Sequence, residues 1–222
     1  PHSAKNAQEI VMPKKTMATN LNNLRVLFFG TPVFSIPTLA MLLQQTQLLA
    51  CVTQPDAPSG RGKINTPSPI KQWSAQQNIL ILQPASLSLK THEGEKFYEH
   101  CKKMKPDIAI VVAYGNIIPS PLLSLPRFGF LNIHPSLLPK FRGPSPIPSA
   151  ILAGENNSGV TIIKLDEGMD TGPILAQKII PIAHDETTAT LMEKCFTHGT
   201  KLLFDILPRY IHGEQLLKPQ DD

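Results

Sequence analysis

The sequence has little charge, and this scarcity already excludes some classes of protein. Only 17% of its 222 residues are charged, against roughly 25% in an average globular domain. Hydrophobic residues make up 41% of the chain. A disordered chain combines low hydrophobicity with high net charge, so this composition excludes one. The formal net charge of +4 is mildly basic and is only suggestive of a polyanionic partner.

Cysteine is also scarce. The three cysteines, Cys51, Cys101 and Cys195, are odd in number, lie far apart and form no CxxC pair. This pattern argues against a disulfide framework and against a zinc site, and we expect no bound metal. Reduced thiols are typical of a cytoplasmic protein, which is where we expect this chain to act.

Long apolar runs are absent. No window approaches the roughly 18 apolar residues of a membrane span, so we expect no membrane partner. Residues 1–22 are polar and lack the apolar core of a signal peptide. We interpret them as a disordered extension or an expression remnant.

Strand and helix patterns alternate regularly from Leu24 onward. We expect strands at 24–30, 48–53, 79–82, 107–112, 130–134, 159–165 and 174–182, and helices at 37–44, 70–77, 95–104, 146–153 and 187–211. Alternation of this kind predicts an α/β fold with a mostly parallel twisted sheet flanked by helices.

The most informative segment is FLNIHPSLLPKFRG, residues 130–143. Side chains repeat on one face of a strand with period two, so Asn132 and His134 should face the same way. Pro135 cannot donate to a sheet ladder and should end the strand there. A carboxamide and an imidazole would then meet at the carboxyl edge of the sheet, where ligands bind in open α/β folds. The competing interpretation is a pair with a purely structural role.

A second polar motif is DEGMDTG, residues 166–172. It places Asp170 between Gly168 and Gly172, and glycine's conformational freedom predicts a tight bend that presents the carboxylate after a strand. The spacing does not match a calcium loop. Such an acid is often structural, but beside His134 it would orient the ring and favour its protonated form, which is useful in acyl chemistry.

Two glycine motifs fail the tests for nucleotide binding. Gly30-Thr31-Pro32 follows the first strand where a dinucleotide-binding protein would show GxGxxG, and GRGK at 60–63 lacks the spacing of a P-loop. A short basic cluster such as GRGK is either a solvated loop or a phosphate contact through Arg61 and Lys63.

Taken together, NIHPSLLPKFRG and LDEGMDTG resemble motifs of the folate-dependent formyltransferase family. TQPDAPSGRGK, PSPIK and RGPSPI are similar to the branch of that family that acts on methionyl-tRNA. The resemblance runs from about Leu24 to the C-terminus and implies a Rossmann-like formyltransferase fold. It implies three groups of site residues: catalytic Asn132, His134 and Asp170; folate-binding Ser136, Leu137, Leu138 and Pro139 beside Val112, Ala113, Tyr114 and Gly115; and tRNA-binding Arg61, Lys63 and Arg142.

The resemblance also implies a reaction and a domain organisation. We expect transfer of a formyl group from 10-formyltetrahydrofolate to the α-amino group of methionyl initiator tRNA, by a monomer without a metal. Relatives of this branch continue into a C-terminal β-barrel that is absent here, so we expect a catalytic domain at 23–214 and the start of a linker at 215–222. The alternatives are glycinamide ribonucleotide, a UDP-amino sugar or water as the formyl acceptor, and a folate-binding module without catalysis.

Overall fold

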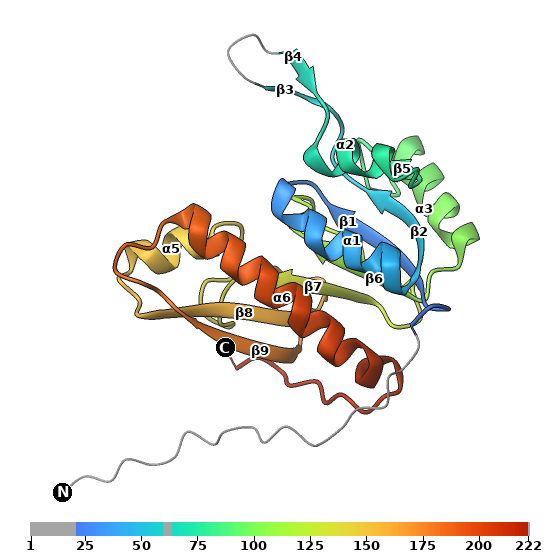
Figure 1. Cartoon of the computed structure of the whole chain (residues 1–222). Coiled ribbons are helices and arrows are strands. Elements are labelled where there is room, and N and C mark those ends of the chain that lie inside the picture. The colour runs from blue at the N-terminus through green and yellow to red at the C-terminus, as the bar shows by residue number, and fades with distance from the viewer. Residues whose placement is uncertain (1–20, 60–63, 222) are drawn as a thin grey trace, which may run out of the picture.

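A seven-stranded sheet forms the centre of the molecule. The computed structural model describes residues 21–59 and 64–221 (Figure 1). The strands are β1 (Arg25–Gly30), β2 (Gln47–Val52), β5 (Ile81–Leu82), β6 (Ile108–Val112), β7 (Phe130–His134), β8 (Asn157–Lys164) and β9 (Ile174–Pro181), and the sheet order is β5-β2-β1-β6-β7-β8-β9. The strands from β5 to β7 in this order are parallel to one another. Strand β8 is antiparallel to β7, and β9 is antiparallel to β8. The predicted fold class, a mostly parallel sheet flanked by helices, is confirmed.

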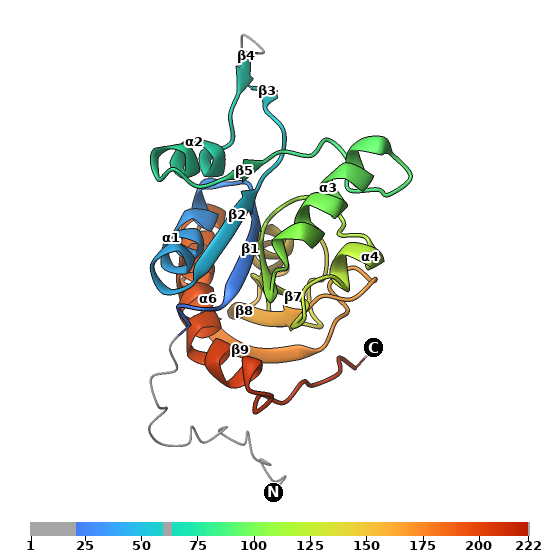
Figure 2. The ribbon, with the colours of Figure 1, turned by 90° about the vertical axis from the view of Figure 1, so that its right-hand side faces the viewer.

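Helices cover both faces of the sheet. They are η1 (Val33–Ser35), α1 (Ile36–Gln45), α2 (Pro69–Gln76), α3 (His92–Met104), α4 (Ser120–Leu123), α5 (Pro146–Leu152) and α6 (Thr188–Ile211). Figure 2 shows α1 and α6 on one side of β1, and α3 and α4 on the other. No helix among the described residues is long and apolar enough to cross a membrane.

Strand β1 shows how the two faces are filled. Val26 and Phe28 belong to a buried cluster that includes Leu39 of α1 and many residues of α6. Leu27 and Phe29, which point to the opposite face, belong to a second buried cluster with residues of α3 and α4. The alternation of strand side chains therefore supplies both cores from one apolar run.

Some boundaries differ from the sequence expectation for local reasons. Helix α3 begins at His92 and not at 95, because the Thr91 hydroxyl caps it by accepting from Gly94 N at 3.1 Å. Helix α6 begins where Thr187 and Thr190 form a reciprocal capping box. Strand β8 begins at Asn157, two residues earlier than expected.

Two short features were not predicted. Strands β3 (Ala57–Ser59) and β4 (Ile64–Thr66) pair antiparallel in a hairpin that stands away from the main sheet (Figures 1 and 2). Pro58 lies in β3, which its edge position permits. The four-residue helix α4 is too short for apolar periodicity to reveal it.

The segment after α6 returns along the sheet edge. Ile174 and Lys218 exchange both backbone hydrogen bonds, at 2.7 and 2.9 Å. This contact brings residues 218–221 beside the loop between β8 and β9, which carries Asp170.

Candidate functional site

The candidate site lies where β6 and β7 end. Strand β7 ends at His134, immediately before Pro135, as the sequence predicts. Its neighbours are β6, which runs parallel, and β8, which runs antiparallel. The carboxyl ends of parallel strands are where open α/β sheets bind ligands.

A cavity of about 550 Å³ opens at this edge. Its size is within the range of about 300–1,000 Å³ typical of small-molecule sites. Five short segments, two residues of α6 and three further residues line it: Ala113–Ile118, Asn132–Pro135, Gly143–Pro148, Leu165–Asp166 and Gly168–Asp170; Met192 and Phe196 of α6; and Phe34, Val111 and Leu123. Phe34 and Phe196 stack with ring centroids 4.4 Å apart and give the cavity a rigid aromatic wall.

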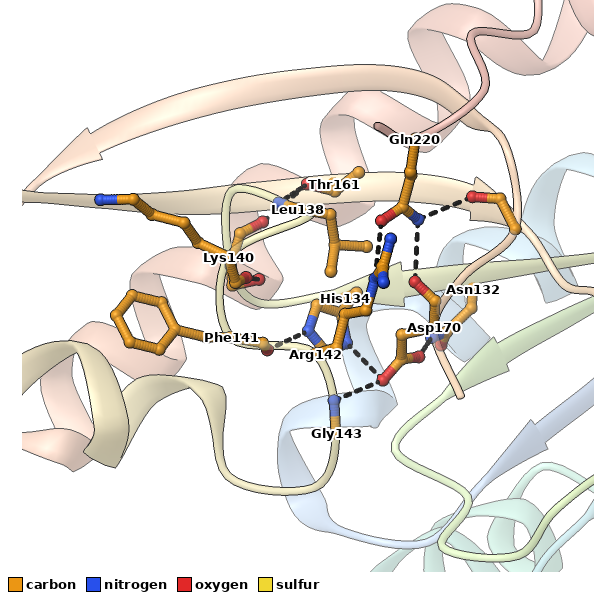
Figure 3. Close-up of polar contacts among 12 residues, drawn as sticks. Asn132, His134, Leu138, Lys140, Phe141, Arg142, Gly143, Thr161, Asp170 and Gln220 are labelled. Atoms are coloured by element: carbon orange, nitrogen blue, oxygen red, sulfur yellow. Dashed lines mark hydrogen bonds and ion pairs between the residues drawn. The ribbon is translucent and has the colours of Figure 1, made fainter. Parts of the chain in front are cut away.

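His134 is buried and held at both ring nitrogens. Its side chain is 4% exposed. Nε2 lies 3.0 Å from the carbonyl oxygen of Phe141, and because a carbonyl can only accept, Nε2 carries a proton and donates. Nδ1 lies 3.5 Å from Oδ2 of Asp170 (Figure 3). The ring is therefore fixed in orientation, with Nδ1 facing a carboxylate.

Asp170 connects the other groups. Its Oδ1 accepts from Asn132 Nδ2 at 3.4 Å, and its Oδ2 accepts from the backbone N–H of Gly143 at 2.9 Å. The Asn132 carboxamide has two N–H bonds, so one remains to be directed into the cavity that Asn132 lines. The structure thus brings Asn132, His134 and Asp170 together at the cavity (Figure 3).

The bend at Asp170 has a different origin from the one expected. Asp170 itself adopts the left-handed conformation, with φ +54°, which aspartate tolerates better than most residues. Gly168 and Gly172 have no positive φ; a Cβ at Gly168 would collide with the Thr171 side chain, and one at Gly172 with the Lys164 carbonyl. The two glycines therefore let neighbouring groups approach the backbone closely. The sequence expectation, that their conformational freedom forms the bend, is not what the structure shows.

The predicted folate residues fall into two groups. Ala113, Tyr114 and Gly115 line the cavity, and their neighbour Val112 is buried in β6. Ser136, Leu137, Leu138 and Pro139 lie just beyond the lining, on the side of β8 and β9. There Leu138 N donates to Thr161 Oγ1, and Gln177 Nε2 donates to the Leu138 carbonyl. Burial raises the pKa of Tyr114 to about 12, so its phenol stays protonated at neutral pH.

Of the three predicted tRNA-binding residues, only Arg142 lies among the described residues. Arg142 is not among the residues that line the cavity; its Nε donates to Gln220 Oε1 at 3.0 Å. Arg61 and Lys63 lie outside the described residues.

Sequence reasoning missed three residues that hold the site. They are Phe141, whose carbonyl accepts from His134; Gly143, whose N–H donates to Asp170; and Gln220, whose side chain contacts the Asp170 loop. Phe141 and Gly143 have positive φ, +58° and +96°. The glycine is a recognisable signal for such a conformation, but nothing in the sequence marks a phenylalanine for it.

None of the three cysteines lines the cavity. Cys51, Cys101 and Cys195 are free and buried, and burial raises the pKa of each thiol to about 12. We expect none to react with iodoacetamide at pH 8 in the folded protein, because the thiolate is the reactive form, and all three to react in guanidinium. Intact-mass analysis checks this, and a cysteine alkylated equally fast in both conditions would contradict it.

The fold and site together define an α/β protein with an acyl-transfer type of site, in which a carboxamide, an imidazole and a carboxylate converge on a ligand cavity. Residues 23–207 match the sequence model of the formyl transferase family. The chain belongs to this family.

Individual relatives within and around this family can be compared with the chain directly. The chain is 42% identical over 199 residues to a methionyl-tRNA formyltransferase of Chloroflexus aggregans, covering 89% of this chain and 63% of that protein. It is 43% identical over 195 residues to one of Myxococcus xanthus, covering 88% and 60%. The chain therefore spans about three fifths of the length of these relatives. Among solved structures, glycinamide ribonucleotide transformylase 1 of Geobacillus kaustophilus superposes with a TM-score of 0.68 at 27% identity, covering 84% of this chain and 98% of that one.

Proposed function

We propose that this chain transfers a formyl group from 10-formyltetrahydrofolate to the α-amino group of methionine esterified to initiator tRNA. The observation that carries the proposal is the convergence of Asn132, His134 and Asp170 on one cavity. Relatives more than 40% identical that carry the name methionyl-tRNA formyltransferase support this choice of acceptor.

The cavity fits the folate donor in size and chemistry. It combines an apolar wall, from Phe34, Phe196 and Met192, with polar groups at Asn116 and the backbone around Gly115. A flat heteroaromatic ring needs both, because the ring faces are apolar and the ring edge is polar. The segment Val112–Gly115 would hold the ring system, and Ser136–Pro139 would support the opposite side of the donor.

The three polar residues would act on the formyl carbon. The neutral amine attacks this carbon, and the former carbonyl oxygen becomes an oxyanion in the tetrahedral intermediate. Asn132 would donate its second N–H to that oxyanion. His134 would donate Nε2–H, which the Phe141 carbonyl accepts in this structure and would share with the oxyanion. Asp170 would keep both donors aimed, since it contacts both side chains.

The proton balance closes within the site. A C–N bond forms to the amine, the bond from the formyl carbon to folate N10 breaks, and the electron pair of that bond stays on N10. The amine loses one proton and N10 gains one. His134 would pass this proton directly or through a water molecule by giving the Nε2 proton to N10 and taking up the amine proton, while Asp170 faces Nδ1.

The alternatives share the donor site and differ in the acceptor. The likeness to a glycinamide ribonucleotide transformylase keeps that acceptor as the second candidate. The deciding experiment incubates the chain with 10-formyltetrahydrofolate and, separately, methionyl initiator tRNA, glycinamide ribonucleotide, a UDP-amino sugar or buffer alone. We expect formylmethionine on the tRNA by mass spectrometry. Formylation of another acceptor, or release of formate alone, would replace the proposal, and folate binding without turnover would indicate a binding module.

The basic segment GRGK, residues 60–63, is proposed to contact the acceptor. Arg61 and Lys63 carry the charge of GRGK, and each phosphate that such a residue neutralises releases counterions. We expect Arg61→Ala to weaken use of methionyl-tRNA and to reduce the salt slope of its binding by about one. Donor affinity should not change. Lost folate binding with retained tRNA affinity would instead assign this segment to the donor site.

We also propose that the chain acts in the cytoplasm as a monomer. The three free, buried cysteines suit a reducing compartment. Light scattering during gel filtration tests the oligomeric state.

A further inference from the structure

The side chain of Gln220 forms hydrogen bonds with both loops that hold the site, and no motif in the sequence predicts them. Residues 218–221 lie against the loop between β8 and β9, because Lys218 pairs with Ile174 through two backbone hydrogen bonds. Gln220 is therefore carried to the Asp170 bend from a segment that is distant in the sequence (Figure 3).

The carboxamide of Gln220 both donates and accepts hydrogen bonds. Nε2 donates to the carbonyl oxygen of Asp170 at 2.8 Å and to that of Gly172 at 2.7 Å. Oε1 accepts from Nε of Arg142 at 3.0 Å. One side chain thus joins the loop that carries Asp170 to the loop that carries Phe141 and Gly143.

This bridge acts on the bend that carries Asp170. Asp170 has φ +54°, a conformation that costs free energy for residues other than glycine, although aspartate tolerates it better than most, so contacts around it help to keep it. Its carboxylate must at once reach Asn132, Gly143 and His134. A clamp on the Asp170 carbonyl limits rotation of the peptide from which that carboxylate projects.

We propose that Gln220 is a positioning residue for formyl transfer, which acts through Asp170 by holding the carboxylate within reach of His134 and Asn132. In its link to catalysis this inference rests on the proposed function. The clamp itself can be tested without activity.

Two substitutions separate the parts of the clamp. Gln220→Ala removes all three hydrogen bonds. Gln220→Glu keeps the length and the acceptor for Arg142, but it loses both donors and turns an oxygen toward the Asp170 and Gly172 carbonyls. If Gln220 served only as a partner for Arg142, the Glu variant would work as well as the wild type.

The chain offers a matched control in Gln215. Its Nε2 donates to the carbonyl of Leu175 at 2.7 Å, so Gln215 ties the same segment to β9 without contacting the Asp170 loop. Gln215→Ala therefore loosens the segment and leaves the clamp in place.

The first readout is the split between kcat and KM in the formyl transfer assay. We expect both Gln220 variants to lower kcat by about tenfold to a hundredfold, since a misplacement of about 1 Å can cost on the order of 10² in rate. KM for the folate donor should stay unchanged, and Gln215→Ala should keep the wild-type kcat. The second readout is amide hydrogen exchange at Gly143, whose N–H donates to Asp170; it should be faster in the Gln220 variants only.

The outcomes distinguish the inference from the proposed function. If the wild type transfers no formyl group, the proposed function fails, and the exchange at Gly143 alone decides the clamp. Wild-type kcat and wild-type Gly143 exchange in Gln220→Ala would overturn the inference. So would equal losses in Gln215→Ala, because the role of Gln220 would then be one of general stability, and so would full activity in Gln220→Glu.

Discussion

His134→Ala is expected to reduce turnover by about 10²–10³, the loss typical for one oxyanion donor. The lost interaction belongs to the transition state, so folate affinity should be nearly unchanged. Steady-state kinetics together with a separate measurement of folate binding checks the split. His212→Ala, an exposed histidine at the end of α6, is the matched control and should behave as wild type.

The same experiment tests whether the three residues work as a unit. Asn132→Ala and Asp170→Ala should each cost a comparable factor, and the triple variant should lose much less than the product of the single losses, because each single change already disables the shared contacts. Wild-type turnover in His134→Ala at saturating substrates would remove the histidine from the mechanism.

The second large effect is expected from Asp170→Asn, although the change is isosteric. The carboxylate accepts from Asn132 on one oxygen and from Gly143 on the other. An asparagine has only one acceptor oxygen, so one of these donors would face an NH2 group whichever way the new side chain turns. Inverting the Asn132 carboxamide would relieve one clash but would direct an oxygen, and no longer a donor, at the formyl group.

We therefore expect Asp170→Asn to lower kcat by about 10²–10³ with little change in the unfolding midpoint. Asp205→Asn, at an exposed position of α6, controls for the loss of one negative charge. Retention of full activity in Asp170→Asn would mean that the carboxylate charge has no role in aiming Asn132 and His134.

The sequence predicted much of the fold because its strands are strongly patterned. Strand β7 was placed at both ends, since an apolar run fixed its start and Pro135 its stop. Helix α3 was started too late because the charged residues after Thr91 show no apolar stripe, and only the hydroxyl cap marks the beginning. The hairpin of β3 and β4 has three residues a strand, which is too short for an alternation to be seen.

The side chains of the candidate site could be predicted from the sequence, but the groups that hold them in place could not. Asn132 and His134 share one strand, and their spacing alone placed them together. The contacts of His134 with Phe141 and of Asp170 with Gly143 involve backbone groups, which every residue carries and no residue type signals. The contact between Gln220 and Asp170 spans 50 residues, and it depends on how the segment after α6 returns along β9.

The central claim is that the formyl group is presented to Asn132, His134 and Asp170 in the 550 Å³ cavity. The most direct test is a crystal structure of the chain with 5-formyltetrahydrofolate as an unreactive analogue of the donor. The account predicts the ring system against Val112–Gly115. It also predicts that N10, the atom that carries the formyl group in the donor, faces Asn132 and His134 across a space that one formyl group can fill. An analogue bound elsewhere on the chain, with N10 remote from Asn132 and His134, would contradict it.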